Sequence, residues 1–261
     1  CFNFGIMTSD HRAYQYIFEH QWWALKKQIE YARQHSKFYD FWLSKHKVKP
    51  SEEWHLEDFL KIPTIDKALV QHHAKDIWCV EKSLIVDYCN TSGTEGIPVT
   101  IPLTKKDIER LAHNESLSLQ LAGGHADDVF QLTTTVDKRF MAGLAYTLGA
   151  HALGAGMVRV GPGLPQLQWQ TINEVGTTAL IAVPSFIVRM LDYAKVHGID
   201  VNATSVKKAI CIGEPIRHAD FTLNTLGQKI ASQWDIQLYS TYASSEMATA
   251  FTECEAGMGG H

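Results

Sequence analysis

Residues 89–99 read Cys89-Asn90-Thr91-Ser92-Gly93-Thr94-Glu95-Gly96-Ile97-Pro98-Val99. The run follows a β-prone segment at residues 83–88, so we expect it to form a loop that leaves a strand. Glycine lets backbone N–H groups turn toward an anion, and serine and threonine hydroxyls add uncharged donors, so the loop can wrap a phosphate. The candidate nucleotide-binding residues in this loop are Thr91, Ser92, Gly93, Thr94, Glu95 and Gly96.

The loop does not match the phosphate-binding pattern G-x-x-x-x-G-K-[ST], because no lysine follows its glycines. A run rich in serine and glycine is also typical of a plain turn between two strands. Both interpretations stay open for this segment by itself, and the rest of the chain has to decide between them.

From about residue 84 the sequence alternates between strand-like and helix-like segments. We predict strands at residues 84–88, 129–134, 157–160, 179–183, 209–212 and 236–239. We predict helices at residues 105–121, 140–153, 164–175, 186–197 and 218–233. This alternation predicts an α/β fold with mostly parallel sheets flanked by helices, in which the loops leaving the carboxyl ends of strands form the ligand site.

The first part of the chain has a different pattern. Residues 10–48 carry apolar and aromatic side chains at helical spacing, which predicts two helices. The signal Thr64-Ile65-Asp66 predicts the start of a short helix that ends near His73. We therefore predict a helical N-terminal segment over residues 1–83 and an α/β core over residues 84–261.

Composition restricts the class of protein. A chain of 261 residues with 45% hydrophobic and 20% charged residues can bury a large core. The net charge of -4 gives no broad basic field, which argues against a nucleic-acid partner. No apolar run approaches the ~20 residues that cross a bilayer, so we expect no membrane association. Five widely spaced cysteines without a C-x-x-C pair favour reduced thiols and a cytoplasmic location.

Two further strand exits carry polar groups. The first follows the predicted strand at residues 209–212, and the second follows the strand at residues 236–239. An aromatic ring can stack on a base, hydroxyls can hold a phosphate and a carboxylate can hold Mg2+, which are the needs of a nucleotide site. Each segment alone also fits a β-to-α turn with a helix cap. The candidate residues are Gly213, Glu214 and Pro215 in the first exit and Tyr242, Ala243, Ser244, Ser245 and Glu246 in the second.

The order of these segments resembles the adenylate-forming superfamily, and most closely its phenylacetate-CoA ligase branch. Residues 91–99 look like the phosphate loop S-S-G-T-T-G-x-P of that family. Residues 213–215 are similar to G-x-E-P without the inserted residue, and residues 242–246 resemble Y-G-x-[ST]-E. Residues 62–64 look like the early L-P-x-T segment, and residues 183–185 match V-P-S.

The resemblance implies roles for single residues. The aromatic ring of Tyr242 would lie by the adenine or the acyl group, and the hydroxyl of Ser245 would contact the α-phosphate. Glu246 would hold Mg2+, which makes Ser245 and Glu246 the catalytic candidates. The implied ligands are ATP or AMP, CoA and Mg2+, with a small carboxylic acid of aryl or arylacetic type as substrate, and a homodimer stays open.

The sequence also departs from the family pattern. Ile97 stands where many relatives carry lysine, and Ala243 replaces a glycine. We find no T-G-D segment and no C-terminal domain with the lysine that assists adenylation. We therefore expect the chain to be the large N-terminal part of an enzyme and to be inactive alone. An acceptor other than CoA (a carrier protein or an amine) stays open, as does a non-catalytic nucleotide-binding protein.

The last residues suggest a second metal site. Cys254 and His261 are separated by six residues that include several glycines, so the thiolate and imidazole can reach one ion. Zinc favours such ligands in tetrahedral structural sites. Two ligands are too few, so the hypothesis requires a further pair beyond residue 261. The alternative is a buried cysteine beside an incidental histidine.

Overall fold

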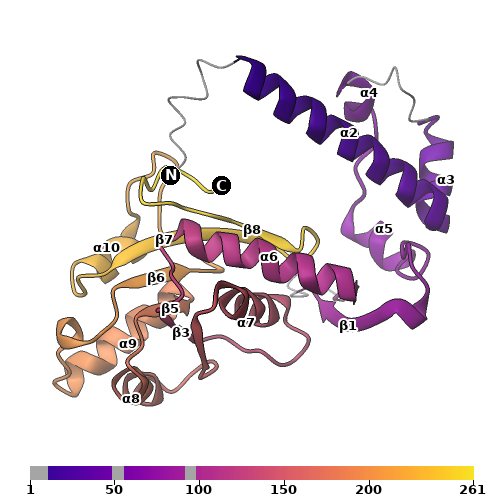
Figure 1. Ribbon diagram of the computed structural model, residues 1–261. Helices are drawn as coiled ribbons and strands as arrows, with labels where there is room; N and C mark the ends of the chain where they lie inside the picture. Colours follow the sequence, from indigo (N-terminus) through magenta and orange to yellow (C-terminus); the bar gives the residue numbers. More distant parts are fainter. Residues whose placement is uncertain (1–10, 49–55, 92–97) are drawn as a thin grey trace. The chain divides into compact units, whose positions relative to one another are not determined.

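The computed structural model describes residues 11–48, 56–91 and 98–261. The described residues fall into two compact units (Figure 1). The first, which we call the α/β unit, contains Lys106–His261 together with residues 89–91. The second, which we call the helical unit, contains the other described residues. The predicted boundary between residues 83 and 84 stays a prediction.

The α/β unit is built on a sheet in the strand order β4-β3-β5-β6-β7-β8. Strands β3 to β7 pair in parallel, and β8 pairs antiparallel with β7. The mostly parallel sheet confirms the predicted α/β fold class. The strands are β3 (Val129–Leu132), β4 (Gly156–Arg159), β5 (Ala179–Ala182), β6 (Lys208–Cys211), β7 (Gln237–Ser244) and β8 (Thr249–Thr252).

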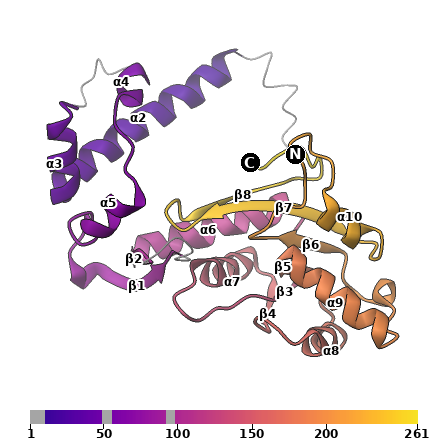
Figure 2. The ribbon, with the colours of Figure 1, turned by 180° about the vertical axis from the view of Figure 1, so that it is seen from behind.

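Helices cover both faces of this sheet (Figure 2). Successive side chains of a strand point to opposite faces, and β5 shows this clearly. Leu180 packs with Trp169 and Met190 on one face, whereas Ile181 packs with Tyr146 on the other. All of β5 is therefore buried. The helices are α6 (Lys105–Leu121), α7 (Met141–Leu153), α8 (Pro165–Val175), α9 (Pro184–Val196) and α10 (Thr225–Ala231).

The direction in which strands are added to the sheet reverses at β3. Strand β4 lies on one side of β3, whereas β5 lies on the other side and β6 and β7 follow outward from it. In parallel sheets, ligands bind outside the carboxyl ends of the strands near such a switch point. The topology therefore marks the ends of β3 and β5, and the exits of β6 and β7 beside them, as the edge to examine.

The predicted end of the strand at residues 236–239 was wrong. Strand β7 continues to Ser244, five residues past the predicted end at residue 239. The reason is β8, which the sequence analysis missed and which pairs with the second half of β7 from Thr241 to Ser244. Pairing with β8 keeps residues 241–244 in an extended conformation, although their composition alone is typical of a loop.

The predicted start of the last helix was also wrong. Helix α10 begins at Thr225 rather than at residue 218. Before it, Phe221 has a φ of 67°, and Arg217 pairs with Leu223 in an isolated bridge. Asn224 then accepts the Gly227 N–H at 3.0 Å and caps the helix. The segment at residues 217–224 is therefore a turn and not a helix.

The helical unit confirms the predicted helical N-terminal segment. Ser36 separates its first two helices, because its hydroxyl accepts the Tyr39 N–H at 3.2 Å and donates to the Asp76 carbonyl at 2.7 Å. Among the described residues, no helix combines the length and the apolar character that crossing a lipid bilayer requires. The elements are α2 (His11–His35), α3 (Lys37–Lys45), α4 (Leu56–Leu60), α5 (Lys67–His72), the 3-10 turn η1 (Lys82–Leu84), β1 (Ile85–Asn90) and β2 (Thr100–Thr104).

Candidate functional site

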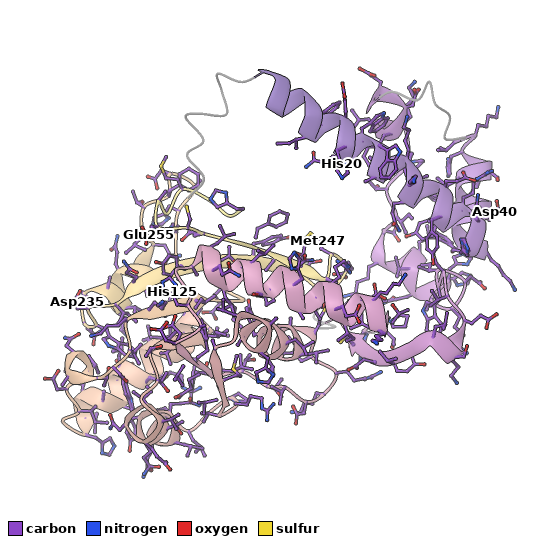
Figure 3. All side chains as sticks on the ribbon, viewed as in Figure 1. His20, Asp40, His125, Asp235, Met247 and Glu255 are labelled. Carbon is purple, nitrogen blue, oxygen red and sulfur yellow. The ribbon has the colours of Figure 1, made fainter. Side chains whose placement is uncertain are left out.

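The residues that follow the parallel strands lie at one edge of the sheet. Figure 3 shows Met247, which follows β7, at one end of the strands, and His125 and Asp235, which precede β3 and β7, at the other end. The segments after β5, β6 and β7 therefore share an edge, as expected for parallel strands. This brings the two candidate exits at residues 213–215 and 242–246 to the same side of the α/β unit.

The exit of β6 turns sharply at Gly213. The Ile212 N–H still donates to the Ala182 carbonyl at 3.0 Å, so sheet pairing continues to this point. Gly213 then has a φ of 75°, which glycine adopts without strain. A Cβ at this position would lie 3.9 Å from Val183 Cγ2, so there is room for a side chain. Glycine is favoured here by the positive φ and not by a lack of room. Gly213 and Pro215 are exposed, and because glycine has no side chain the exposed surface of Gly213 is backbone that a ligand can reach.

The carboxylate of Glu214 binds the exit of β5. Its Oε2 accepts the Ser185 N–H at 2.9 Å, and its Oε1 accepts the Ser185 hydroxyl at 2.9 Å. Ser185 belongs to the first turn of α9, so a negative charge is favoured there. Ser185 was not among the predicted site residues, although the V-P-S segment was a signal for it.

A second contact holds the other end of this exit. The Asn224 amide donates to the Pro215 carbonyl at 2.7 Å, and the Asn224 N–H donates to the Ile216 carbonyl at 2.9 Å. Asn224 also caps α10, so one side chain joins the exit loop to the helix that follows it. The loop after β6 is therefore anchored to helices on both sides.

The second candidate segment is a β-hairpin. Tyr242, Ala243 and Ser244 lie in β7, so the predicted loop at these positions was wrong, whereas Ser245 and Glu246 lie in the turn before β8. Tyr242 is 68% exposed and pairs across the hairpin with Phe251 on β8. The ring of Tyr242 is therefore open to a partner such as a base.

Glu246 lies in the hairpin turn with an exposed side chain. Its Oε2 accepts the Ser244 hydroxyl at 2.9 Å, and the Ser244 Oγ also accepts the Met247 N–H at 3.4 Å. The Ser244 hydroxyl therefore holds the Glu246 carboxylate beside the end of β7. An exposed carboxylate beside hydroxyls is a donor set that fits a hard cation such as Mg2+.

The sequence did not predict an ion pair between Arg217, in the loop after β6, and Glu253, which follows β8. The Arg217 Nε donates to Glu253 Oε1 at 2.8 Å, and the Ser240 N–H donates to Glu253 Oε2 at 2.9 Å. Glu253 is buried, so this contact joins the loop after β6 to β7 and β8. No sequence signal marks the pair, because its members are 36 positions apart and belong to different elements.

Cys211, at the end of β6, lies close to this ion pair. Burial, helped by the charge of Glu253 and opposed by that of Arg217, raises the pKa of its thiol to about 12. A thiol with so high a pKa stays protonated at neutral pH and is a poor nucleophile. Cys211 therefore belongs to the core and not to the chemistry of the site.

The start of the predicted phosphate loop joins the same unit. The Asn90 N–H donates to the Arg139 carbonyl at 2.9 Å, and Asn90 forms a parallel bridge with Phe140, which precedes α7. Thr91 follows and is buried. The other residues predicted for this loop, namely Ser92, Gly93, Thr94, Glu95 and Gly96, lie outside the described residues.

The two predicted zinc ligands are neighbours. His261 Nε2 lies 3.3 Å from Cys254 Sγ, and the His261 N–H donates to the Thr252 carbonyl at 3.1 Å. Within residues 11–48, 56–91 and 98–261, no group of three or more His, Cys, Asp or Glu side chains is placed to hold a metal ion. The zinc site stays a prediction.

Comparison with known sequences identifies relatives. A phenylacetate-coenzyme A ligase of Aromatoleum evansii is 29% identical over 169 residues, which are 64% of this chain and 38% of that protein. A phenylacetate-coenzyme A ligase of Thermus thermophilus is 26% identical over 192 residues, which are 73% of this chain and 43% of that protein. The chain thus spans less than half the length of these curated relatives.

A solved structure shares the fold. A crystal structure of 2-hydroxyisobutyryl-CoA ligase in complex with 2-HIB-AMP and CoA matches with a TM-score of 0.78 and 23% sequence identity. The match covers 88% of this chain and 50% of that one. The family model for AMP-binding enzymes matches residues 27–259, which is most of the sequence. The chain therefore belongs to the family of AMP-binding enzymes.

Proposed function

We propose that the complete protein uses ATP to activate a carboxylic acid and then transfers the acyl group to CoA, which yields acyl-CoA, AMP and pyrophosphate. The observation that carries this proposal is that residues 213–215 and 242–246, the two segments proposed to bind the nucleotide, lie at the same edge of the sheet. The chain that holds them belongs to the family of AMP-binding enzymes. The phenylacetate-coenzyme A ligases among the relatives support an aryl or arylacetic acid as the substrate.

The chemistry solves a leaving-group problem. A carboxylate resists attack by a thiol, because its charge is delocalised and oxide does not leave. In the proposed reaction a carboxylate oxygen attacks the α-phosphorus of ATP and pyrophosphate leaves. The CoA sulfur then attacks the carbonyl carbon of the acyl-adenylate, and AMP leaves. The protein mainly positions these reactants and stabilises the charge that develops.

The proposed roles follow from the position of each group. The exposed ring of Tyr242 offers a stacking surface for the adenine or the acyl group. The exposed backbone around Gly213 offers hydrogen bonds to the adenine, and Ser245 in the hairpin turn offers a hydroxyl to the α-phosphate. The glycine-rich loop that begins at Thr91 would hold the other phosphates.

Glu246 is the proposed Mg2+ ligand. Magnesium binds proteins through one or two carboxylates and completes its shell with substrate phosphates and water, so a single exposed carboxylate is sufficient. Bound magnesium would neutralise phosphate charge during adenylation. The role of the protein is to hold the Glu246 carboxylate in place through the Ser244 hydroxyl.

Two assays on the complete protein test the proposed function. Adenylation predicts acid-dependent exchange of labelled pyrophosphate into ATP, and transfer predicts a thioester with free CoA. Exchange without a CoA thioester would instead support a carrier protein or an amine as the acceptor. ATP binding without exchange would support a non-catalytic nucleotide-binding protein and refute the enzyme.

The zinc site, the cytoplasmic location and the homodimer stay proposals. Zinc at Cys254 and His261 is supported by the 3.3 Å distance between His261 Nε2 and Cys254 Sγ. Cys254 is disulfide-bonded, contrary to the expectation of reduced thiols, so zinc would bind only after this bond is reduced. Metal analysis of the complete protein tests it. Less than ~0.1 zinc per chain after purification without chelator would contradict a structural site, since such sites bind zinc tightly.

A further inference from the structure

Helix α9 lacks a cap of its own. Its N-cap residue is Val183, whose side chain makes no capping hydrogen bond, and Pro184 has no N–H to donate. The first free donor of the helix is therefore the Ser185 N–H, which needs an acceptor from elsewhere. The helix is 13 residues long, so its N-terminus carries the full partial positive charge of a helix end.

Glu214 supplies the missing acceptor from another strand exit. Its two oxygens accept the Ser185 N–H and the Ser185 hydroxyl, each at 2.9 Å, across a sequence separation of 29. Both oxygens of the carboxylate are thus committed to one residue. A charged acceptor at a helix N-terminus forms stronger bonds than a neutral one.

From this geometry we infer that Glu214 is a positioning residue that locks the loop after β6 onto α9, so that the backbone at Gly213 and Pro215 keeps the conformation needed for the nucleotide. The inference rests on the proposed function, which assigns this loop to the adenine side. It differs from a direct ligand role, because both oxygens of the Glu214 carboxylate accept hydrogen bonds from Ser185. Gly213 and Pro215, the exposed neighbours, are left to face the nucleotide.

The rest of the loop supports this division of roles. The Pro215 carbonyl is held by Asn224 at 2.7 Å, and the Ile212 N–H is held by Ala182 at 3.0 Å. Glu214 lies between these two anchors and provides the side-chain link to the exit of β5. Without it, the loop would be fixed at its two ends and free to move in the middle, at the residues closest to the proposed adenine position.

The test is a double-mutant cycle in the complete protein, with ATP as the varied substrate in the pyrophosphate exchange assay. Glu214→Ala should raise the KM for ATP about tenfold, and Ser185→Ala, which loses one of the two bonds, about threefold. Glu214→Gln, which keeps an acceptor oxygen, should fall between wild type and Glu214→Ala. The value of kcat should change less than about twofold in each, because the reacting groups are untouched.

The decisive result is the coupling between the two positions. If Glu214 acts through Ser185, adding Ser185→Ala to Glu214→Ala should leave the KM for ATP unchanged. A direct contact of Glu214 with the nucleotide predicts instead that Ser185→Ala alone is silent. Additive effects or a silent Ser185→Ala would overturn the inference while the exchange activity of the wild type still upheld the proposed function. A wild type that neither binds ATP nor exchanges pyrophosphate would refute both.

Thr178→Val is the matched stability control. The Thr178 hydroxyl donates to Asp128 Oδ1 at 2.6 Å, which is a hydroxyl–carboxylate bond like that of Ser185, but both residues precede their strands and lie at the opposite edge of the sheet. This variant should lower the urea midpoint and leave the KM for ATP unchanged. A KM that rises in step with lost stability in all variants, Thr178→Val included, would show a structural role and overturn the inference.

Discussion

Glu115 of α6 shows how one buried carboxyl can make stability depend on pH. It lies against α7 where Gly149 permits close approach, since a Cβ on that glycine would lie 2.7 Å from Glu115 Cβ. Its Oε1 is buried without a hydrogen-bond partner. Burial raises the pKa of Glu115 from 4.5 to about 7, because a charge is costly in an apolar contact.

Glu115→Gln should therefore flatten the pH dependence of stability. In the wild type no penalty exists below pH ~4.5, where the folded and unfolded states are both protonated. As pH rises toward 7 the unfolded state loses its proton first, so the free energy of unfolding should fall by roughly 3 kcal/mol by pH 8. Urea denaturation at pH 5 and pH 8 measures this change, and the variant should be the more stable protein at pH 8.

The control for this experiment is Glu174→Gln, which changes an exposed glutamate on α8. It should retain the wild-type difference between pH 5 and pH 8. Equal slopes in the wild type and Glu115→Gln would contradict the assignment of the pH dependence to Glu115.

Glu246 is the residue on which the proposed chemistry depends most directly. Glu246→Gln keeps the size of the side chain and an acceptor for the Ser244 hydroxyl but removes the charge. Turnover of the complete protein should fall at least ~10-fold, about 1.4 kcal/mol of transition-state stabilisation. Steady-state rates at several Mg2+ concentrations measure it. Glu255→Gln, a change at an exposed position past the far end of β8, should keep the wild-type rate, and an unchanged rate in Glu246→Gln would contradict the metal role.

At the scale of single elements, end points depend on partners that a local pattern does not reveal. Strand β7 runs to Ser244 because β8 returns beside it, and α10 starts late because Asn224 caps it. The same two adjustments shape the candidate site. The hairpin presents the ring of Tyr242 from a strand, and Asn224 holds the Pro215 carbonyl.

Asn224→Ala should destabilise α10 and loosen the exit of β6 together. It removes the cap on the Gly227 N–H and the bond to the Pro215 carbonyl, so the free energy of unfolding should fall by about 1–2 kcal/mol. Urea denaturation of the complete protein checks this value. Asn173→Ala, at an exposed position of α8, should cost less than ~0.5 kcal/mol. Equal losses in the two variants would show that the cap has no special role.

At the scale of the whole molecule, the amino ends and the carboxyl ends of the parallel strands carry different kinds of residue. Before the strands, Lys208 donates to Asp128 at 3.0 Å in a mostly buried ion pair that ties β6 to β3. Burial alone would raise the pKa of Asp128, but hydrogen bonds from Thr178, His125 and Lys208 outweigh it and lower the pKa. After the strands lie the exposed glycine, hydroxyl and carboxylate groups proposed for the nucleotide. The groups proposed for the nucleotide thus lie at the other end of the strands from the Lys208–Asp128 ion pair.

Residues 1–261 produced alone should not catalyse acid-dependent pyrophosphate exchange, whereas the complete protein should. Residues 1–261 span 38% to 45% of the phenylacetate-coenzyme A ligases they resemble, and no T-G-D segment, which the family resemblance implies for ribose binding, occurs among them. Exchange assays on both proteins, with ATP binding measured in parallel, check this expectation. Robust exchange by residues 1–261 would contradict it.

The sequence by itself determined the α/β fold class, the helical N-terminal segment and the segments that mark the family, because alternating strand and helix patterns and glycine-rich exits are local signals. It also placed residues 213–215 after β6 and Ser245 and Glu246 after β7, since parallel strands bring their carboxyl ends to one edge. The tertiary structure alone decided that Glu214 binds Ser185, that Arg217 pairs with Glu253 and that Tyr242 stands on a strand. These contacts join residues from different elements, and only the packing of the sheet and helices brings such residues within hydrogen-bonding distance.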